Sequence, residues 1–452
     1  MKIYNTLSKT IEEFVPADSE NVSLYTCGPT VYDSAHIGNL RTYLFEDFLK
    51  RTLSFSGFFV NHVMNITDVD DKTIKKAVGD KEKLLSETKK IEANFVEDLK
   101  KLNIELPDKF TRATEYIEQM VALVSSLLDK GFAYKAEDGS IYFSISKFEN
   151  YGKLSGLDKE GLKSGARVNQ DEYDKENPAD FVLWKAWDEA DGSIFWESTL
   201  GKGRPGWHIE CSAMSQDALG ESIDIHAGAV DLIFPHHENE IAQSEAATGK
   251  KFAKYWVHGE HLLVDNKKMS KSLNNFYTLN DIIEKGYSPL DFRYLCLQAH
   301  YRSKLNFTWE SLEGARNARK NIENIICNIR PETVDSEILS IENQYLREFT
   351  DKIANDLNAP EALAVFWKML KDESITGEER FSLATKMDSV LGLGIECITK
   401  DLIPEEVMNL VSERENAREQ KNWAESDRLR NEITALGYGV EDTGEGSKVS
   451  KN

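Results

Sequence analysis

Cysteine and long apolar runs are both scarce in this chain of 452 residues. Its five cysteines are scattered and odd in number, which argues against a disulfide framework and is typical of a reducing compartment. No apolar run is long enough to span a bilayer, and the first residues lack the apolar core of a signal peptide. We therefore expect a cytoplasmic protein that makes no contact with a membrane.

Positive charge is also scarce, since 55 lysines and arginines face 77 acidic residues and leave a net charge of -22. This balance argues against a basic nucleic-acid coat, but it leaves room for a local basic surface that docks a specific RNA. The sequence shows no internal repeat and no low-complexity tract. Its length predicts about three domains.

The N-terminal part predicts a βαβ unit. Residues 22–27 alternate as a strand does, a loop begins at Gly28, and an amphipathic helix with apolar residues from 40 to 49 precedes a second strand at 58–66. The ligand site of such a unit lies at the carboxyl end of the strand, where Cys27 stands. A small buried hydrophobe is the alternative reading of a lone cysteine.

A nucleotide site is predicted where the loop becomes the helix, at His36 and Gly38. The N-terminus of a helix offers free N–H groups and the positive end of its dipole to phosphate. A glycine there lets a ligand approach the backbone closely. The spacing matches neither the phosphate loop that ends in Lys-Ser/Thr nor a GxGxxG fingerprint.

Residues 235–246 predict a helix that begins at Pro235, since proline is tolerated at a first helical position. His236 and Glu240 are four residues apart on this helix, so their side chains project from one face. The side chain of Glu238 points elsewhere. A capped surface helix is the alternative interpretation of this segment.

Cys27 and Cys211 also stand at loop ends of the predicted sheet. Together with His236 and Glu240 they make two sulfurs, a nitrogen and an oxygen available for tetrahedral zinc.

A lysine-bearing loop follows a predicted hairpin turn at Asp265 and Asn266. The three lysines Lys267, Lys268 and Lys271 form either an ordinary solvated charge cluster or a mobile loop that neutralises a triphosphate as pyrophosphate leaves.

Residues 68–130 are predicted to be charged helices, with 68–71 capping the first of them. Residues 203–214 predict a loop leading into a helix, and residues 312–398 predict helices, one of them over 344–369. The C-terminal part predicts a charged helix with several arginines and a mobile polar tail over 441–452.

The residues 36–39 (His-Ile-Gly-Asn) and 268–272 (Lys-Met-Ser-Lys-Ser) resemble the paired signature motifs of class I aminoacyl-tRNA synthetases. Longer blocks at 26–32, 203–214 and 234–243 resemble the cysteinyl-tRNA synthetases specifically. The resemblance runs almost end to end and includes residues 151–156, 299–303 and a helix over 414–433.

The resemblance implies an α/β fold: a class I Rossmann-type parallel-sheet catalytic domain with a connective insertion, followed by a helical bundle and a small C-terminal tRNA-binding domain. We expect the boundaries to be 1–115 and 201–255 for the two catalytic halves, 116–200 for the insertion, 256–311 for the stem-contact region with the lysine loop, 312–398 for the bundle and 399–452 for anticodon recognition.

The resemblance also implies the chemistry. One zinc ion is expected on Cys27, Cys211, His236 and Glu240, where it binds the thiolate of the substrate cysteine and so rejects serine without an editing domain. ATP, with Mg²⁺, and L-cysteine form cysteinyl-adenylate, and the cysteinyl group then passes to tRNA(Cys). The implied partners are these substrates, and we expect a monomer. The expected contacts are His36, Gly38, Asn39, Lys268 and Lys271 for phosphates, Asp231 for the ribose, and Trp207 and Thr67 for the cysteine.

Three departures from the family pattern stand out. Ala227 and Ala229 flank Gly228 where the family has consecutive glycines, so two methyl groups are predicted to crowd the nucleotide. Asn266 replaces a glycine in the turn before the lysine loop, and the C-terminus lacks a tryptophan expected near its end. Two other functions remain open: a ligase that passes activated cysteine to an amino sugar, and an inactive zinc- and nucleotide-binding paralogue with a regulatory role.

Overall fold

The computed structural model describes residues 1–157, 180–269, 275–331, 343–399, 404–443 and 446–451. These residues form two compact units, Met1–Glu396 and Cys397–Asn452. Lys271 of the lysine loop lies outside the described residues. Within the described parts of the chain, no helix combines the length and the apolar character that crossing a bilayer requires.

A five-stranded parallel sheet in the order β11-β10-β3-β4-β5 organises the first unit. Its strands are β3 (Asn21–Thr26), β4 (Phe59–Ile66), β5 (Lys109–Arg112), β10 (Ile223–Ala229) and β11 (Ala253–Gly259). From β3 the chain moves outward to β4 and β5, whereas β10 and β11 extend the sheet on the other side. The strand order therefore reverses between β3 and β10, and a crevice forms there at the carboxyl ends of the strands.

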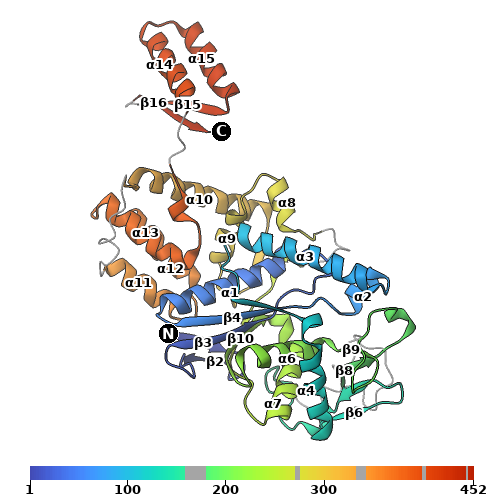
Figure 1. Ribbon diagram of the computed structural model, residues 1–452. Helices are drawn as coiled ribbons and strands as arrows, with labels where there is room; N and C mark the ends of the chain where they lie inside the picture. Colours follow the sequence, from blue (N-terminus) through green and yellow to red (C-terminus); the bar gives the residue numbers. More distant parts are fainter. Residues whose placement is uncertain (158–179, 270–274, 332–342, 400–403, 444–445, 452) are drawn as a thin grey trace. The chain divides into compact units, whose positions relative to one another are not determined.

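Helices cover both faces of this sheet (Figure 1), which confirms the predicted βαβ unit and the α/β class. Helix α1 (Ile37–Phe55) lies on one face, and α6 (Trp207–Leu219) and α7 (Glu238–Thr248) lie on the other. The central strands β3, β4, β10 and β11 are mostly buried, although each also carries polar residues. The carboxyl end of β3 and the beginning of α1 thus frame the crevice from one loop.

Between β4 and β5 lie α2 (Asp71–Ala77) and α3 (Lys81–Lys101). Asp70 caps α2 as expected, since its carboxylate accepts a hydrogen bond of 2.7 Å from the Thr73 amide. The expectation of helix throughout this region was wrong at β5. That strand has only four residues, and it is a strand because β4 provides a pairing edge, which local sequence does not reveal.

The connective region contains α4 (Ile117–Asp129) and an antiparallel sheet of β6 (Ala133–Lys135), β7 (Ile141–Phe143), β8 (Phe181–Ala186) and β9 (Gly203–Pro205). Residues 203–205 were expected to be loop, and the structure corrects this: they pair with β8. The strand runs directly into α6, so the sheet of the insertion leads the chain back to the central fold.

The first unit also contains two small groups of strands. A hairpin of β1 (Lys2–Asn5) and β2 (Thr10–Glu13) opens the chain, and β12 (Leu262–Val264), β13 (Lys267–Lys268) and β14 (Leu305–Phe307) form a three-stranded sheet. The hairpin turn at 265–266 is confirmed: Asp265 and Asn266 have φ of 49° and 60°, the left-handed values that asparagine tolerates.

The helices that follow are α8 (Leu279–Glu284), α9 (Pro289–Leu297), α10 (Trp309–Ile329), α11 (Gln344–Ile353), α12 (Ala359–Leu370) and α13 (Gly377–Leu391). The helices α10 to α13 agree with the prediction over 312–398, with one correction, whereas α8 and α9 were not predicted. The single helix expected over 344–369 is broken at Asp356 and Leu357, whose φ values of 57° and 55° no α-helix contains.

The second unit pairs α14 (Glu405–Glu419) and α15 (Trp423–Ala435) with a hairpin of β15 (Tyr438–Thr443) and β16 (Gly446–Lys451). The expected mobile tail is therefore wrong, because its residues form this hairpin. The expected helix over 414–433 is interrupted between α14 and α15. Arg414 is buried and donates hydrogen bonds of 2.8 and 2.9 Å to the carboxylate of Asp442, which joins α14 to the hairpin.

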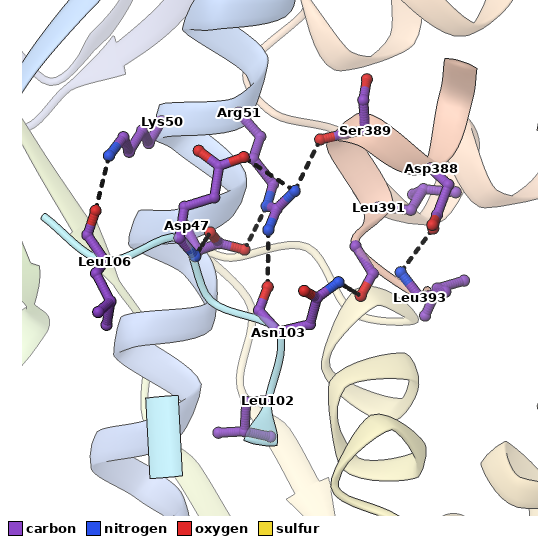
Figure 2. Close-up of polar contacts among 12 residues, drawn as sticks. Asp47, Lys50, Arg51, Leu102, Asn103, Leu106, Asp388, Ser389, Leu391 and Leu393 are labelled. Atoms are coloured by element: carbon purple, nitrogen blue, oxygen red, sulfur yellow. Dashed lines mark hydrogen bonds and ion pairs between the residues drawn. The ribbon is translucent and has the colours of Figure 1, made fainter. Parts of the chain in front are cut away.

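A buried ion-pair cluster joins α1 to α9, to α13 and to the segment after α3. Asp47 accepts hydrogen bonds from Arg51 Nε at 2.8 Å and from Arg293 of α9 at 2.6 Å. Figure 2 shows Arg51 reaching both the Asn103 carbonyl after α3 and the Ser389 carbonyl of α13. Arg293 in turn donates to the Leu391 carbonyl at 2.7 Å. One carboxylate therefore joins four segments that are far apart in the sequence.

Removing the charge of Asp47 should destabilise the first unit strongly. Asp47→Asn leaves the buried Arg293 guanidinium without its paired carboxylate and leaves Arg51 with the more exposed Glu105, and breaking a buried pair in this way typically costs about 3–5 kcal/mol. Urea unfolding followed by circular dichroism measures the loss. Glu97→Gln, which breaks an exposed pair with Lys100, is the control and should leave stability unchanged. Equal stability of the two variants would contradict this role for Asp47.

Candidate active site and metal centre

Cys27 lies at the crevice because the chain just after β3 is held from both sides. Its amide donates to the Ala227 carbonyl of β10 at 3.3 Å, and the next amide, of Gly28, donates to Asn65 Oδ1 of β4 at 2.8 Å. Gly28 runs so close to β4 that a Cβ atom would stand 1.8 Å from the Asn65 carbonyl oxygen. Only glycine permits this approach, which places the Cys27 side chain at the switch point.

The other three residues of the predicted cluster reach the same place from the face of the sheet that α6 and α7 cover. They are Cys211, His236 and Glu240. Cys211 stands in the second turn of α6, and the other two flank the beginning of α7. One donor atom from each, together with Cys27 Sγ, forms a set in which all atoms lie within 4.8 Å of one another. All four side chains are buried. The predicted four-residue cluster is thus assembled in space.

The segment before α7 differs from the predicted helix start. The Phe234–Pro235 peptide bond is cis, Phe234 has non-helical dihedral angles, and the α-helix proper begins at Glu238. Pro235 is therefore not an ordinary first helical residue. His236 and Glu240 nevertheless approach, with 3.2 Å between Nε2 and Oε1. Glu238 points away, as expected, and accepts hydrogen bonds from the amides of Gly152 and Ser155.

The chemistry of the cluster fits a bound cation. Burial raises the pKa of the Cys27 thiol well above its ordinary value, and it also raises the pKa values of Cys211 and Glu240. Burial lowers the pKa of His236 well below its ordinary value. Glu240 Oε1 is fully buried and receives no hydrogen bond from any described residue. A divalent cation reverses the penalty on thiolates and carboxylate, because its charge stabilises their ionised forms.

Histidines that the sequence interpretation missed surround this cluster. His226 Nε2 lies 2.9 Å from Glu240 Oε2, and His237 Nε2 lies 3.3 Å from Cys27 Sγ. His237 also meets His258, and His208 meets His236 Nδ1 at 2.9 Å. A second set with metal-ligand spacing consists of Cys27, His226, His237 and Glu240. Hydrogen bonds from neighbouring histidines, as from His208 to His236, orient ligating side chains. A signal was present, because His208 and His237 stand in the motif blocks at 203–214 and 234–243.

Trp207 and Thr67 adjoin the cluster. The Trp207 ring stacks on the His236 ring, with 4.3 Å between centroids and 27° between planes. Thr67 follows β4, is buried, and donates its hydroxyl proton to Glu210 Oε2 at 2.9 Å. Glu210 was not singled out from the sequence, although it immediately precedes Cys211. Both predicted substrate contacts therefore lie beside the proposed ligands.

The 36–39 motif is a helix cap. His36 Nδ1 accepts the Asn39 amide at 3.1 Å, and Asn39 Oδ1 accepts the His36 amide at 3.2 Å, so the two residues cap α1 reciprocally. Because Nδ1 accepts, the neutral imidazole carries its proton on Nε2. A Cβ on Gly38 would stand 3.0 Å from the His36 ring and 3.1 Å from Met269. The absence of a side chain at Gly38 keeps this close contact free of strain.

The lysine loop approaches this cap from its two described ends. Met269 lies against Gly38, and beyond the loop the Tyr277 carbonyl accepts the Ile37 amide at 2.9 Å. Lys268 is exposed on β13, and Asp231 is exposed just beyond β10. The two signature motifs are therefore neighbours in space.

The alanines that replace glycines differ in exposure. Ala227 is fully buried inside β10, where it pairs with Thr26 and Val257, so its methyl group belongs to the core. Ala229, at the end of the strand, is partly exposed. Of the two methyl groups predicted to crowd the nucleotide, only that of Ala229 reaches the accessible side of the crevice.

Comparison with known proteins agrees with this geometry. A family profile described as the class I (C) tRNA synthetase catalytic domain matches residues 13–317. The Mycobacterium tuberculosis methionyl-tRNA synthetase in complex with methionyl-adenylate superposes with a TM-score of 0.56 at 14% identity, over 83% of this chain and 90% of that chain. That likeness concerns the fold. The chain is a class I tRNA synthetase.

A second profile, the cysteinyl-tRNA ligase anticodon binding domain, matches residues 400–449. A cysteine–tRNA ligase of Chlamydia felis is 51% identical over 465 residues, covering 99% of this chain and 97% of the relative. One of Protochlamydia amoebophila is 46% identical over 467 residues, covering 100% and 98%. The chain therefore belongs to the cysteine–tRNA ligase family.

Gly28→Ala should displace the loop that carries Cys27. The added methyl group has no room against the Asn65 carbonyl, so the loop must move and the four-residue cluster must open. We expect a lower melting temperature and less bound metal than in the wild type, measured by calorimetry and metal analysis of the same preparation. Gly314→Ala is the control, because a Cβ there meets no atom within 4 Å in α10. Unchanged metal content in Gly28→Ala would contradict the requirement for glycine.

Proposed function

We propose that this chain activates L-cysteine with ATP to cysteinyl-adenylate and transfers the cysteinyl group to the 3′ end of tRNA(Cys), with zinc selecting the substrate thiol. The observation that carries the proposal is the buried set of Cys27, Cys211, His236 and Glu240, at the switch point of a class I sheet. The loop that begins at this set ends at the helix cap of α1. A small substrate can therefore meet the metal at one end and ATP at the other.

The donor set favours zinc. Two thiolates select zinc over magnesium or calcium, and an imidazole and a carboxylate complete a tetrahedral set. When bound, zinc supplies a soft Lewis acid that prefers a thiolate to a hydroxyl, which separates cysteine from serine where shape alone discriminates poorly. The protein orients the set, since His226 fixes the Glu240 carboxylate and His237 lies against Cys27.

The residues around α1 would serve ATP. The Nε2 proton of His36 and the Gly38 amide would donate to phosphate oxygens, since the Ile37 and Asn39 amides already donate to Tyr277 and His36. Asn39 keeps the His36 ring oriented through the reciprocal cap. Lys268 and Lys271 would neutralise charge as pyrophosphate leaves, and Asp231 would bind the ribose. Magnesium would accompany ATP. These groups act by position and charge, which is how enzymes accelerate transfer from a triphosphate.

Two features support tRNA as the acceptor. The chain carries the helices α10 to α13, and residues 400–449 match an anticodon binding domain. An amino sugar as the acceptor would leave both without a purpose, and an inactive paralogue would not need the complete ligand set and the intact helix cap. We further propose a monomer in the cytoplasm. Cys27, Cys211, Cys296 and Cys397 are not in disulfide bonds in the structure, which accords with a reducing compartment.

Metal analysis of Cys211→Ser tests the metal-based part. A serine hydroxyl is a poor zinc ligand, so we expect about one zinc per chain in the wild type and a large loss of zinc and of tRNA charging in the variant. Cys397→Ser changes an exposed cysteine and serves as the control, with zinc and charging unchanged. A zinc-free wild type that still charges tRNA with cysteine would overturn the metal-based account of specificity.

The acceptor is tested separately with the full chain. Cysteine-dependent exchange of pyrophosphate into ATP reports activation alone, and charging of tRNA(Cys) reports transfer. We expect both in the wild type, with no cysteine transferred to an amino sugar. Exchange without charging would favour the amino-sugar ligase, and absence of exchange would favour the inactive paralogue.

A further inference from the structure

Arg41 differs from every other buried arginine that the structure describes. It stands in the second turn of α1 and is 5% exposed. Each of the others holds at least one carboxylate: Arg51 and Arg293 hold Asp47, Arg204 holds Asp71 and Asp191, and Arg414 holds Asp442. The hydrogen bonds that Arg41 makes with described residues all go to backbone carbonyls, so its burial does not serve to neutralise an acid.

The guanidinium group of Arg41 binds three of these carbonyls. Its Nη1 donates to the Glu260 carbonyl at 2.8 Å and to the His261 carbonyl at 2.5 Å, and its Nη2 donates to the Ser303 carbonyl. Glu260 and His261 lead from β11 into β12, and Ser303 stands two residues before β14. The planar fork of an arginine can bridge separated acceptors in this way, whereas the single ammonium group of a lysine cannot. Arg41 therefore joins α1 to the beginnings of two strands of one sheet.

Phe45 reinforces this contact from the next turn of α1. It comes four residues after Arg41 and so lies on the same face of the helix. Its ring stacks on the Tyr301 ring, with 4.9 Å between centroids and 7° between planes. A Cβ on Gly259 would stand 2.9 Å from the Phe45 ring, so β11 ends against this side chain. One face of α1 thus holds both chain segments, through a polar contact and an apolar one.

The sheet that Arg41 contacts carries the second signature motif. β12 pairs with β14 on one side and with β13 on the other, and β13 ends at Lys268. The far end of the lysine loop is held by the same helix, because the Ile37 amide donates to the Tyr277 carbonyl at 2.9 Å. Helix α1 therefore holds the chain on both sides of the loop, through Arg41 before it and through its first amide after it.

The proposed phosphate site shows why this contact matters. In the proposed function, His36 and the Gly38 amide donate to phosphate from α1, and the lysines approach the same phosphates from the loop. Groups that act by position lose on the order of 100-fold in rate when they are displaced by about 1 Å. The two motifs belong to separate elements, so a contact between these elements must fix the distance between them.

We propose that Arg41 is a positioning residue for ATP, which fixes the distance between the phosphate contacts of α1 and those of the lysine loop. It acts through the three carbonyls and not by contact with ATP. The cysteine site does not depend on it, since the loop after Cys27 is held by β4 and β10. This inference rests on the proposed function, because it takes ATP at the beginning of α1 as its reference point.

Arg41→Lys tests the inference, because it keeps the positive charge and removes the fork that bridges the carbonyls. The kcat of cysteine-dependent pyrophosphate exchange, expressed per titrated active site, should fall on the order of 100-fold. The Kd of ATP, measured by calorimetry, should rise about 10-fold, the loss expected when one charge-assisted hydrogen bond to phosphate is no longer made. The Kd of L-cysteine should stay unchanged, which a general loss of structure would not allow.

Arg319→Lys is the matched control. Arg319 of α10 pairs with the buried Asp291, so this variant also weakens an arginine contact in the interior, but it leaves the lysine loop and its sheet intact. It should lower the melting temperature and change neither Kd. Phe45→Leu weakens the contact of α1 with the same two segments while Arg41 stays in place. It should raise the Kd of ATP alone, and it decides the question if Arg41→Lys does not fold.

Three results would overturn the proposal: equal rises of both Kd values in Arg41→Lys, an unchanged kcat and Kd of ATP in that variant, or an ATP-specific loss in Arg319→Lys. Failure of the proposed function is read separately, as a wild type that binds ATP and cysteine but exchanges no pyrophosphate. In that case the Kd of ATP in the variants still decides the role of Arg41.

Discussion

The constraint on which the rest of the structure depends is the burial of two thiols, an imidazole and a carboxylate in one small space. Each of these groups loses its hydration there, and burial shifts the pKa values of all four toward the neutral forms. Such an arrangement is stable only with a rigid frame and a compensating charge. The frame is the switch point of a parallel sheet, where β3, β4 and β10 hold the loop after Cys27 through backbone hydrogen bonds.

The geometry of a single loop connects the two halves of the proposed chemistry. The loop leaves the metal cluster at Cys27 and enters α1 at His36, so its two ends correspond to the two ends of a cysteine molecule. In the proposed chemistry the thiol binds at the first end and the carboxylate, which attacks ATP, at the second. A chain of hydrogen bonds from Asn65 through Thr67 to Glu210 adjoins this loop, since the Thr67 amide donates to the Pro29 carbonyl.

The position of α1 matters for the same reason, because its first turn is proposed to contact phosphate. Asp47 fixes the middle of this helix against α9 and α13 through two arginines. The beginning of the helix is fixed by the reciprocal cap of His36 and Asn39 and by the Tyr277 carbonyl. A helix held at both places cannot turn its N-terminus away from the crevice, so the anion site is preorganised without any bound ligand.

The sequence by itself determined what depends on local pattern and on residue identity. The βαβ unit, the hairpin turn at Asp265 and Asn266 and the start of a helix after His36 are readable from spacing and residue type, and the four cluster residues from their places in the predicted fold. Family resemblance then related these motifs to one another. The roles of Lys271, Asp231 and the other proposed contacts stay predictions.

Only the tertiary structure decided what depends on distant partners. β5 and β9 are short strands that exist because a strand distant in the sequence completes their hydrogen bonds, and no local window contains that neighbour. The histidines around the cluster come from four separate segments, and Glu210 meets Thr67 across 143 residues. Side-chain hydrogen bonds of this kind leave no periodicity in the sequence, because each requires only one suitable polar residue at a place that the fold alone brings into contact.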